Sequence, residues 1–347
     1  MIARSGLRLI VAACGASLIA GAASAQPAND VAAFYRGQTV RMLVGYEAGA
    51  GYDVYARTFG RFFVQHLPGQ PTMIVQNMPG AGSLTMANHL ASVAPRDGAT
   101  LGAASRSIWF EPLWGNTQAR FDPRALTWIG SINQDVAICA MWHTSPIKSL
   151  ADAQAHESIL GSAGAASDST VFPRLLNGIL GTKFRVVSGY KGTETVGLAM
   201  ERGEVEGTCG ATWATIKGAR KDWVEHDRIN VILQLALTKH PELPNARLVV
   251  DAARSDAERQ ALELVFAPQA MGRPITAPPA IPPERAAALR AAFDATMKDA
   301  EFLAAAAKQN LEVLPMDGAA VAELLGRVYA SPPAIVAKVK ELRAAGG

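Results

Sequence analysis

The sequence is poor in the residues that mark several common classes of protein. Its 347 positions include three cysteines, 18% charged residues and 7% aromatic residues, and the net charge is only +3. An average soluble domain has roughly 25% charged residues. A nucleic-acid-binding protein carries a strong basic stripe, and many use aromatic side chains for base stacking. The composition therefore argues against that class.

Apolar residues are abundant instead, at 49% of the chain. This content is enough to bury a large core and excludes wholesale disorder. A chain of this length exceeds what one core usually holds, so we expect two domains. After residue 25, no segment has the ~18 uninterrupted apolar residues of a membrane span.

The first 25 residues are typical of a secretory signal peptide. Two arginines precede an apolar stretch over residues 9–23, and a small-x-small motif ends at Ala25. We expect cleavage before Gln26 and export to the periplasm. Cleavage removes the two arginines and no acid, so the net charge falls from +3 to +1. A membrane anchor is the alternative, but the apolar stretch is short for a span.

The three cysteines raise separate questions. Cys14 lies in a sequence similar to a lipoprotein-processing site, although the apolar run before it is very short. Cys139 and Cys209 remain after cleavage, and both lie in apolar, strand-like runs. Since a periplasmic protein is in an oxidising compartment, they form either a disulfide or two buried thiols. No pattern of histidines and cysteines predicts a metal site.

Strands and helices alternate along the chain, which predicts an α/β fold. A strand–helix–strand–helix–strand start indicates a parallel sheet with helices on its faces. A second unit of the same kind follows, and the tail is helical after a proline-rich connector over residues 272–283. We expect strands at 38–46, 72–77, 99–104, 128–131, 135–142, 158–161, 185–188, 205–209 and 230–237, and helices at 52–67, 83–94, 149–155, 170–180, 193–202, 255–266, 284–310 and 318–330.

Three loops, at 47–53, 79–83 and 162–170, each run from a strand end to a helix start. They combine glycine or alanine with Ser, Thr or Asp, so each exposes backbone N–H groups at the positive end of a helix dipole. That arrangement suits a carboxylate or another anion, and ligands of open α/β sheets bind at the carboxyl ends of strands. Each loop taken singly is also explained as a turn with a capping residue. The first lacks the third glycine of a dinucleotide site and the second lacks the P-loop lysine.

Four further features have both a functional and a structural interpretation. Arg106 follows the third strand and would bind a ligand carboxylate or pair with Glu111. Asp168, beside two serines, is a site residue or a solvated helix cap. The turn that begins at Tyr190 holds a ligand or only joins two elements. Trp213 lines a cleft or lies in the core. No G-x-S-x-G motif is present, and no catalytic set of residues is evident.

The motifs taken together resemble those of the substrate-binding receptors of tripartite tricarboxylate transporters, the Bug-type periplasmic receptors. The resemblance covers nearly the whole chain after the signal peptide. It rests on the motifs GYEAGAGYD at 45–53, NMPGAGS at 77–83, APRDGATL at 94–101 and GYKG at 189–192. Each motif is weak alone, whereas their order is fairly specific.

The resemblance implies a two-lobed periplasmic-binding-protein fold of type II-like architecture, a venus flytrap that closes on a small carboxylate. Each lobe would hold a mostly parallel sheet flanked by helices, with a hinge of two crossing segments. Lobe one would comprise residues 26–134 and 228–347, and lobe two residues 135–227. We expect a monomer without cofactor or metal that delivers its ligand to membrane permease subunits.

The resemblance and the loops together give a set of candidate ligand-binding residues. They are Tyr46, Gly49, Gly51, Asp53, Gly82, Ser83, Ser105, Arg106, Ser162, Ser167, Asp168, Thr170, Tyr190, Gly192 and Trp213. Two residues depart from the usual pattern, because Glu47 adds a negative charge and Arg106 stands where small hydroxyl residues are typical. The ligand class therefore stays open among dicarboxylates, aromatic acids and amino-acid-like compounds. A ligand sensor for a signalling partner and a secreted hydrolase or lyase remain the alternative functions.

Overall fold

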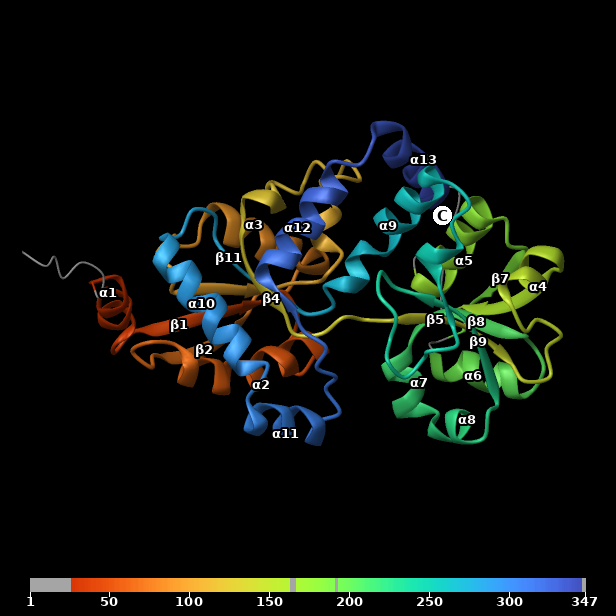
Figure 1. The fold of residues 1–347 in the computed structure, drawn as a ribbon, viewed down its shortest axis with the longest axis horizontal. Coiled ribbons are helices and arrows are strands. Elements are labelled where there is room, and N and C mark those ends of the chain that lie inside the picture. Colours follow the sequence, from red (N-terminus) through yellow and green to blue (C-terminus); the bar gives the residue numbers. More distant parts are fainter. Residues whose placement is uncertain (1–25, 163–166, 191–192, 345–347) are drawn as a thin grey trace, which may run out of the picture.

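The computed structural model describes residues 26–162, 167–190 and 193–344. It has two lobes that lie side by side, each built around a six-stranded sheet with helices on its faces (Figure 1). The predicted two-lobed α/β fold is confirmed. Among the described helices, none is long and apolar enough to cross a membrane.

Lobe one contains the sheet β12-β4-β11-β3-β1-β2. Its strands are β1 (Thr39–Val44), β2 (Thr72–Asn77), β3 (Thr100–Ala103), β4 (Thr127–Ser131), β11 (Pro274–Ala277) and β12 (Met316–Asp317). Its α-helices are α1 (Gln26–Tyr35), α2 (Gly51–His66), α3 (Leu84–Ser92), α10 (Pro283–Thr296), α11 (Ala300–Lys308) and α12 (Gly318–Tyr329). Short 3-10 turns are η1 (Ala81–Ser83), η2 (Ile108–Phe110) and η3 (Pro123–Ala125).

Lobe two contains the sheet β10-β9-β5-β8-β6-β7. Its strands are β5 (Ala137–Trp142), β6 (Ser158–Ser162), β7 (Phe184–Ser188), β8 (Gly207–Thr212), β9 (Ile229–Leu235) and β10 (Arg247–Leu248). Its helices are α4 (Leu150–Ala155), α5 (Asp168–Leu180), α6 (Thr193–Glu201), α7 (Trp213–Ala219), α8 (Lys221–Glu225), α9 (Asp256–Ala270), α13 (Pro333–Ala344) and the 3-10 turn η4 (Val249–Ala252).

Both sheets are mixed, whereas the sequence predicted mostly parallel ones. In lobe one, β1 pairs in parallel with β2 and β3, but β11 enters antiparallel between β3 and β4. In lobe two, β5 enters antiparallel between β8 and β9. The reason is connectivity, since β5 and β11 are the strands that arrive from the other lobe, after residues 132–136 and 271–273.

The predicted return to lobe one at Arg228 is too early. β9 and β10 belong to the second sheet, and α9 packs against α5, so the chain returns at residues 271–273. A third crossing at residues 330–332 leads to α13, which packs on α5 and α9 rather than on lobe one. The strand at 230–237 was itself predicted correctly. Its partner was not, because an apolar run does not specify which sheet it joins.

The proline-rich segment over residues 272–283, which was predicted to be a connector, contains β11, a central strand of the lobe-one sheet. β11 is fully buried, and its proline, Pro274, is the first residue of the strand, a position that tolerates proline. The helix predicted over residues 284–310 is two helices, α10 and α11. Asp299 is the N-cap of α11, and its side chain accepts hydrogen bonds from the N–H groups of Glu301 and Phe302. That cap explains why the alanine-rich run does not continue as one helix.

The two cysteines of the described chain lie opposite each other in lobe two. Cys139 on β5 pairs with Cys209 on β8 across the antiparallel ladder. Their Cα atoms are 3.8 Å apart and their sulfur atoms are in bonding contact. The placement is compatible with a disulfide, which is one of the two alternatives that the sequence left open and stays a prediction.

Candidate functional site

The chain crossings place both sets of strand ends between the lobes. β11 begins where β3 ends, with Ile275 opposite Ala103, and β5 begins where β8 ends, with Ala137 opposite Thr212. The crossings therefore lie at the carboxyl edge of both sheets. A cavity of about 380 Å³ opens there. It is lined by Tyr55, Arg106, Asn133, Asp135, Thr212, Ala214, Thr215, Arg273, Asn310 and Glu312.

A larger cavity, of about 520 Å³, lies between α9 and α12. Aliphatic side chains such as Leu264, Leu324 and Val328 line much of it. We take the smaller cavity as the candidate site because it lies where strand ends and helix starts of both lobes meet and because charged groups converge on it.

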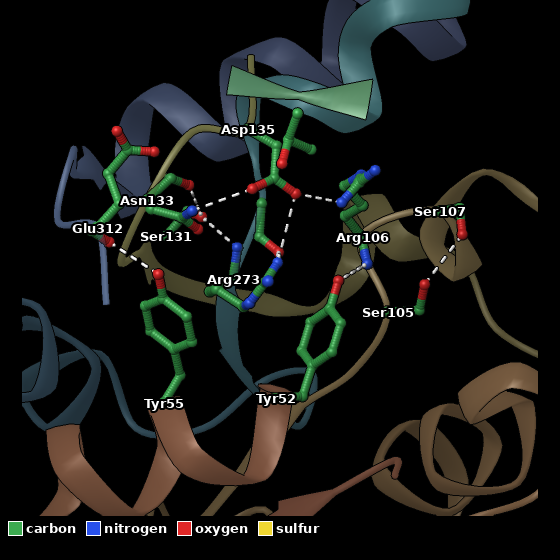
Figure 2. A network of polar contacts seen from close by, with 12 residues as sticks. Tyr52, Tyr55, Ser105, Arg106, Ser107, Ser131, Asn133, Asp135, Arg273 and Glu312 are labelled. Carbon is green, nitrogen blue, oxygen red and sulfur yellow. Dashed lines mark hydrogen bonds and ion pairs between the residues drawn. The ribbon is translucent and has the colours of Figure 1, made fainter. Parts of the chain in front are cut away.

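Asp135 is the centre of a polar network in this cavity (Figure 2). Its Oδ2 faces the Nη1 atoms of two guanidiniums, those of Arg106 and Arg273, the latter at 3.4 Å. Its Oδ1 accepts a hydrogen bond of 3.1 Å from Asn133 Nδ2. Only 6% of Asp135 is exposed. A buried carboxylate requires such compensation, and here residues after β3, after β4 and before β11 supply it.

Arg106 joins the two lobes at the cavity. Its backbone N–H donates to the Tyr52 hydroxyl at 2.9 Å in lobe one, and its Nη2 donates to Asp168 Oδ2 at 3.2 Å in lobe two. Burial opposes the charge on the guanidinium, but Asp135, with Asp168, outweighs burial and raises its pKa. The alternative prediction, that Arg106 pairs with Glu111, is wrong, because the Glu111 carboxylate accepts a hydrogen bond from Asn116 instead.

Two tyrosines on the first turns of α2 hold Arg273. The guanidinium carbon of Arg273 lies 4.5 Å from the ring centroid of Tyr52 and 4.9 Å from that of Tyr55. The tyrosines are three residues apart, so both face the same side of the helix. The Tyr55 hydroxyl donates to the carbonyl of Glu312 at 3.0 Å, and burial raises the pKa of Tyr55 to about 12. Cation–π contact and hydrogen bonding therefore orient Arg273.

The first predicted loop is fastened from within lobe one. Asp53, 2% exposed, accepts hydrogen bonds from Gly49 N, Arg57 Nε and Asn77 Nδ2 at 2.8, 2.9 and 2.8 Å. These partners occupy the carboxylate that was expected to face a ligand. Gly51 lies beside Arg273, because a Cβ there would come within 3.9 Å of its Nη2. Of the candidates in this loop, Gly51 therefore lies near the cavity, whereas Asp53 holds the loop in place through its hydrogen bonds.

Tyr46 and the second predicted loop support the cavity from behind. The Tyr46 ring stacks on the Tyr52 ring with centroids 4.7 Å apart. Ser83, which follows Gly82, is fully buried; its hydroxyl donates to Gly45 O and accepts from Ser105 N, both at 3.1 Å. The turn thereby ties the ends of β1 and β3 together. A Cβ on Gly45 would overlap the Ser83 side chain, so this contact requires glycine.

The third predicted loop places Asp168 toward lobe one. The Ser162 hydroxyl lies 3.1 Å from that of Ser167 and also contacts that of Thr170. Gly210 on β8, with φ +126°, lies so close to the start of α5 that a Cβ would overlap the Asp168 carbonyl. Burial raises the pKa of the Asp168 carboxyl, against the opposing charges of Arg106 and Arg343. Half of the Asp168 side chain stays exposed, at 47%.

The remaining candidates lie apart from the polar network. Trp213 is buried in the lobe-two core and its Nε1 donates to Glu242 at 2.7 Å, in line with the structural interpretation. Tyr190 is partly buried, and its N–H donates to Ser162 O at 3.3 Å. The Ser105 hydroxyl is 2.9 Å from that of Ser107. Gly192 and residues 163–166 lie outside the described residues.

The comparisons with known proteins agree with this architecture. A family model described as "Tripartite tricarboxylate transporter family receptor" matches residues 63–340. The chain belongs to this receptor family. A curated protein of Cupriavidus necator, "UPF0065 protein in gbd 5'region", is 34% identical to the receptor over 122 residues. That alignment covers 35% of this chain and 34% of the relative, so the chain spans about a third of that protein's length.

Solved structures show the same fold as the receptor. A TctC solute-binding protein from Polaromonas superposes with a TM-score of 0.70 at 20% identity, covering 89% of this chain and 98% of that one. An R. palustris protein with adipate gives 0.53 at 16%, covering 89% and 97%. MatC from Rhodopseudomonas palustris with bound malate gives 0.51 at 16%, covering 88% and 99%. At these identities the likeness establishes the fold alone.

Of the ten residues that line the cavity, Arg106 alone was among the predicted candidates, and the other nine were not. Among these nine, Asp135 and Asn133 lie in the first crossing, Arg273 lies in the second, and Tyr55 is on α2. The sequence holds one signal for Asn133, Asp135 and Arg273: each is a polar residue shortly before a buried strand, β5 or β11, and such a residue marks a strand that enters its sheet from the cavity side. That signal needs the crossings to be known first.

Proposed function

We propose that this receptor captures a small carboxylate in the cavity between its lobes, in the periplasm, and delivers it to the membrane subunits of a tripartite tricarboxylate-type transporter. The observation that carries the proposal is the convergence of Arg106 and Arg273 on a cavity lined by both lobes. Guanidiniums bind carboxylates through charge-assisted hydrogen bonds, often two at a time.

Family membership and named relatives support the same function. The family is one of solute-binding receptors, and two solved relatives carry adipate or malate. Both compounds are dicarboxylates of a size that a cavity of about 380 Å³ accommodates. The N-terminal segment, with its predicted cleavage before Gln26, supports the periplasmic location.

The arrangement supplies a mechanism for signalling that ligand is present. Arg106 extends from lobe one and already contacts Asp168 of lobe two, so a ligand bound at Arg106 also contacts both lobes. Such a ligand favours the closed arrangement of the lobes and shifts the population toward it. The transporter then recognises the closed lobe surfaces.

A thermal-shift screen with mono-, di-, tri- and aromatic carboxylates tests the proposal, because a ligand of the folded state raises the melting temperature. We expect at least one carboxylate to stabilise the wild type, and to stabilise Arg106→Gln much less. Arg185→Gln is the matched control, since Arg185 is 59% exposed on β7 and pairs weakly with Glu157. No shift with any carboxylate, or turnover of one, would contradict a receptor function.

A further inference from the structure

A buried histidine of lobe two contacts a carboxylate of lobe one beside the candidate site. His240 follows β9 and is 4% exposed, and its Nε2 lies 3.1 Å from Oε1 of Glu312. Glu312 lies between α11 and β12, so the contact joins different lobes. Both residues line a cavity of about 490 Å³, which shares Ala214, Asn310 and Glu312 with the candidate site. The lobes therefore meet here through side chains, outside the three crossings.

The neighbours of the His240 ring decide which nitrogen carries its proton. The backbone N–H of Glu242 lies 3.1 Å from His240 Nδ1, and a backbone N–H acts only as a donor. Nδ1 is therefore an acceptor, so the neutral ring carries its proton on Nε2. Nε2–H then donates to the Glu312 carboxylate, which in its ionised form only accepts. The ring thus uses one nitrogen within lobe two and the other toward lobe one.

Lobe two holds the loop that carries His240 in place. Gln234 of β9 is fully buried, and its side-chain oxygen accepts the N–H of His240 at 2.7 Å. The amide nitrogen of Gln234 donates to two carbonyls further along the loop, at 2.7 and 2.9 Å. The Glu242 carboxylate accepts from Trp213 Nε1 at 2.7 Å and lies 2.6 Å from Lys217 Nζ. All these contacts lie within lobe two, so His240 moves with that lobe.

Glu312 connects this contact to the candidate site within lobe one. Its backbone carbonyl accepts the Tyr55 hydroxyl at 3.0 Å, and the Tyr55 ring centroid lies 4.9 Å from the guanidinium carbon of Arg273 (Figure 2). Lys217 Nζ lies 4.0 Å from the Glu312 carboxylate, farther than His240 does. Glu312 therefore contacts His240 with its side chain and, with its backbone, the tyrosine that packs on Arg273.

We propose that the hydrogen bond between His240 and Glu312 is an interlobe clasp that stabilises the ligand-competent arrangement of the lobes. His240 acts as a positioning residue that does not touch the ligand. The inference rests on the proposed function, since it concerns how the lobes close around that site. Separation of the lobes breaks the bond, so its loss lowers the population of the competent arrangement. Because the apparent dissociation constant varies inversely with that population, every ligand should weaken by the same factor.

Two replacements of His240 separate the roles of its two nitrogens. The side-chain oxygen of asparagine takes the place of Nδ1, and the amide N–H₂ of glutamine takes the place of Nε2. His240→Asn keeps an acceptor for the Glu242 N–H but no longer reaches Glu312, whereas His240→Gln keeps the interlobe donor. His66→Asn is the matched control, because His66 Nε2 lies 2.8 Å from the Asp299 carboxylate within lobe one.

Calorimetric titration with malate and with adipate measures the apparent dissociation constants of the wild type and the three variants. We expect His240→Asn to raise both constants about tenfold, as the loss of one hydrogen bond to a charged group predicts. His240→Gln and His66→Asn should bind nearly as tightly as the wild type. Small-angle X-ray scattering without added carboxylate gives the radius of gyration of each protein, for use if the wild type binds neither compound.

Each outcome supports or overturns the inference. Wild-type affinity in His240→Asn overturns it. Equal losses in His240→Asn and His240→Gln also overturn it, since they assign the effect to the loop itself. A loss that differs between malate and adipate does the same, since it places His240 against the ligand.

The scattering measurement separates this inference from the proposed function. If the wild type binds neither compound, a radius of gyration that is larger in His240→Asn than in His66→Asn supports the clasp. Equal radii then overturn it. The wider carboxylate panel decides the proposed function in both cases.

Discussion

Two loops with similar sequences serve different purposes in the two lobes. The first, at 47–53, and the third, at 162–170, both join a strand to a helix with small residues and an aspartate. In lobe one, Asp53 is buried and takes all its partners from its own lobe. In lobe two, Asp168 is half exposed and contacts Arg106 of the other lobe. The same motif therefore stabilises one lobe and forms an interlobe contact in the other.

The largest expected effect concerns how lobe two is stabilised. We propose that Cys139 and Cys209 form a disulfide, which closes a loop with a sequence separation of 70 residues. A loop of that length predicts that reduction lowers the free energy of unfolding by about 4 kcal/mol. Urea unfolding with and without reductant, beside a thiol titration of the denatured protein, measures this. Two free thiols before reduction would disprove the bond.

Asp53→Asn should destabilise the protein by about 2–3 kcal/mol, because it places an amide N–H₂ among three donors in a buried position. Ligand affinity should change little, since Asp53 contacts only lobe one. Urea unfolding and a titration measure the two effects. A variant that is as stable as the wild type but has lost binding would place Asp53 in the binding site and end the contrast between the loops.

The stability that Asp53 contributes should depend on pH. Burial acts to raise the pKa of its carboxyl, but hydrogen bonds from Arg57, Gly49 and Asn77 outweigh burial and lower it. A lowered folded-state pKa gives stability that is present above the ordinary value, roughly pH 4, and is lost as the pH falls further. The difference between wild type and Asp53→Asn should thus be constant from about pH 7 to 5 and shrink below about 4. A constant difference to about pH 2 would contradict this.

The smallest expected effect is on the stability of Asp168→Asn. The Asp168 side chain is 47% exposed, and exposed ion pairs contribute little to stability. The free energy of unfolding should therefore change by no more than about 0.5 kcal/mol. Chemical denaturation beside Asp53→Asn gives the direct contrast. A loss above about 1.5 kcal/mol would show that Asp168, like Asp53, is chiefly structural.

Local patterns predicted the elements well and their assembly less well. The strands β1, β2 and β3, the helices α2 and α3, and the two-lobed fold followed from the spacing of apolar residues and from the family motifs, whereas the helix α1 was not predicted. The strand β11 did not, because Pro274 and the prolines that follow it indicate a connector. The boundary at Arg228 was wrong because β9 joins β5, a contact between distant segments that an apolar run does not specify.

Some residues near the candidate site could be predicted from their local position in the sequence. Others were missed because they come together only in the folded chain. Arg106 and Asp168 follow strand ends and were both predicted as candidate residues, each beside a structural interpretation, and they contact each other between the lobes. Asp135 and Arg273 meet only because two crossings run side by side, 138 residues apart along the chain. Conversely, Asp53 was expected to face a ligand, and its partner Asn77 comes from the next strand, which a motif does not reveal.

The exchange of strands between the lobes has a consequence for synthesis. The gap between β3 and β4 is filled by β11, which is made only after all of lobe two, so the first 131 residues cannot complete a sheet by themselves. An unfilled gap exposes backbone groups and apolar surface of the kind that recruits chaperones. Lobe two, whose sheet strands are contiguous from β5 to β10, can close first. The chain should therefore fold from its middle outward, and the N-terminal lobe should be the later one to form.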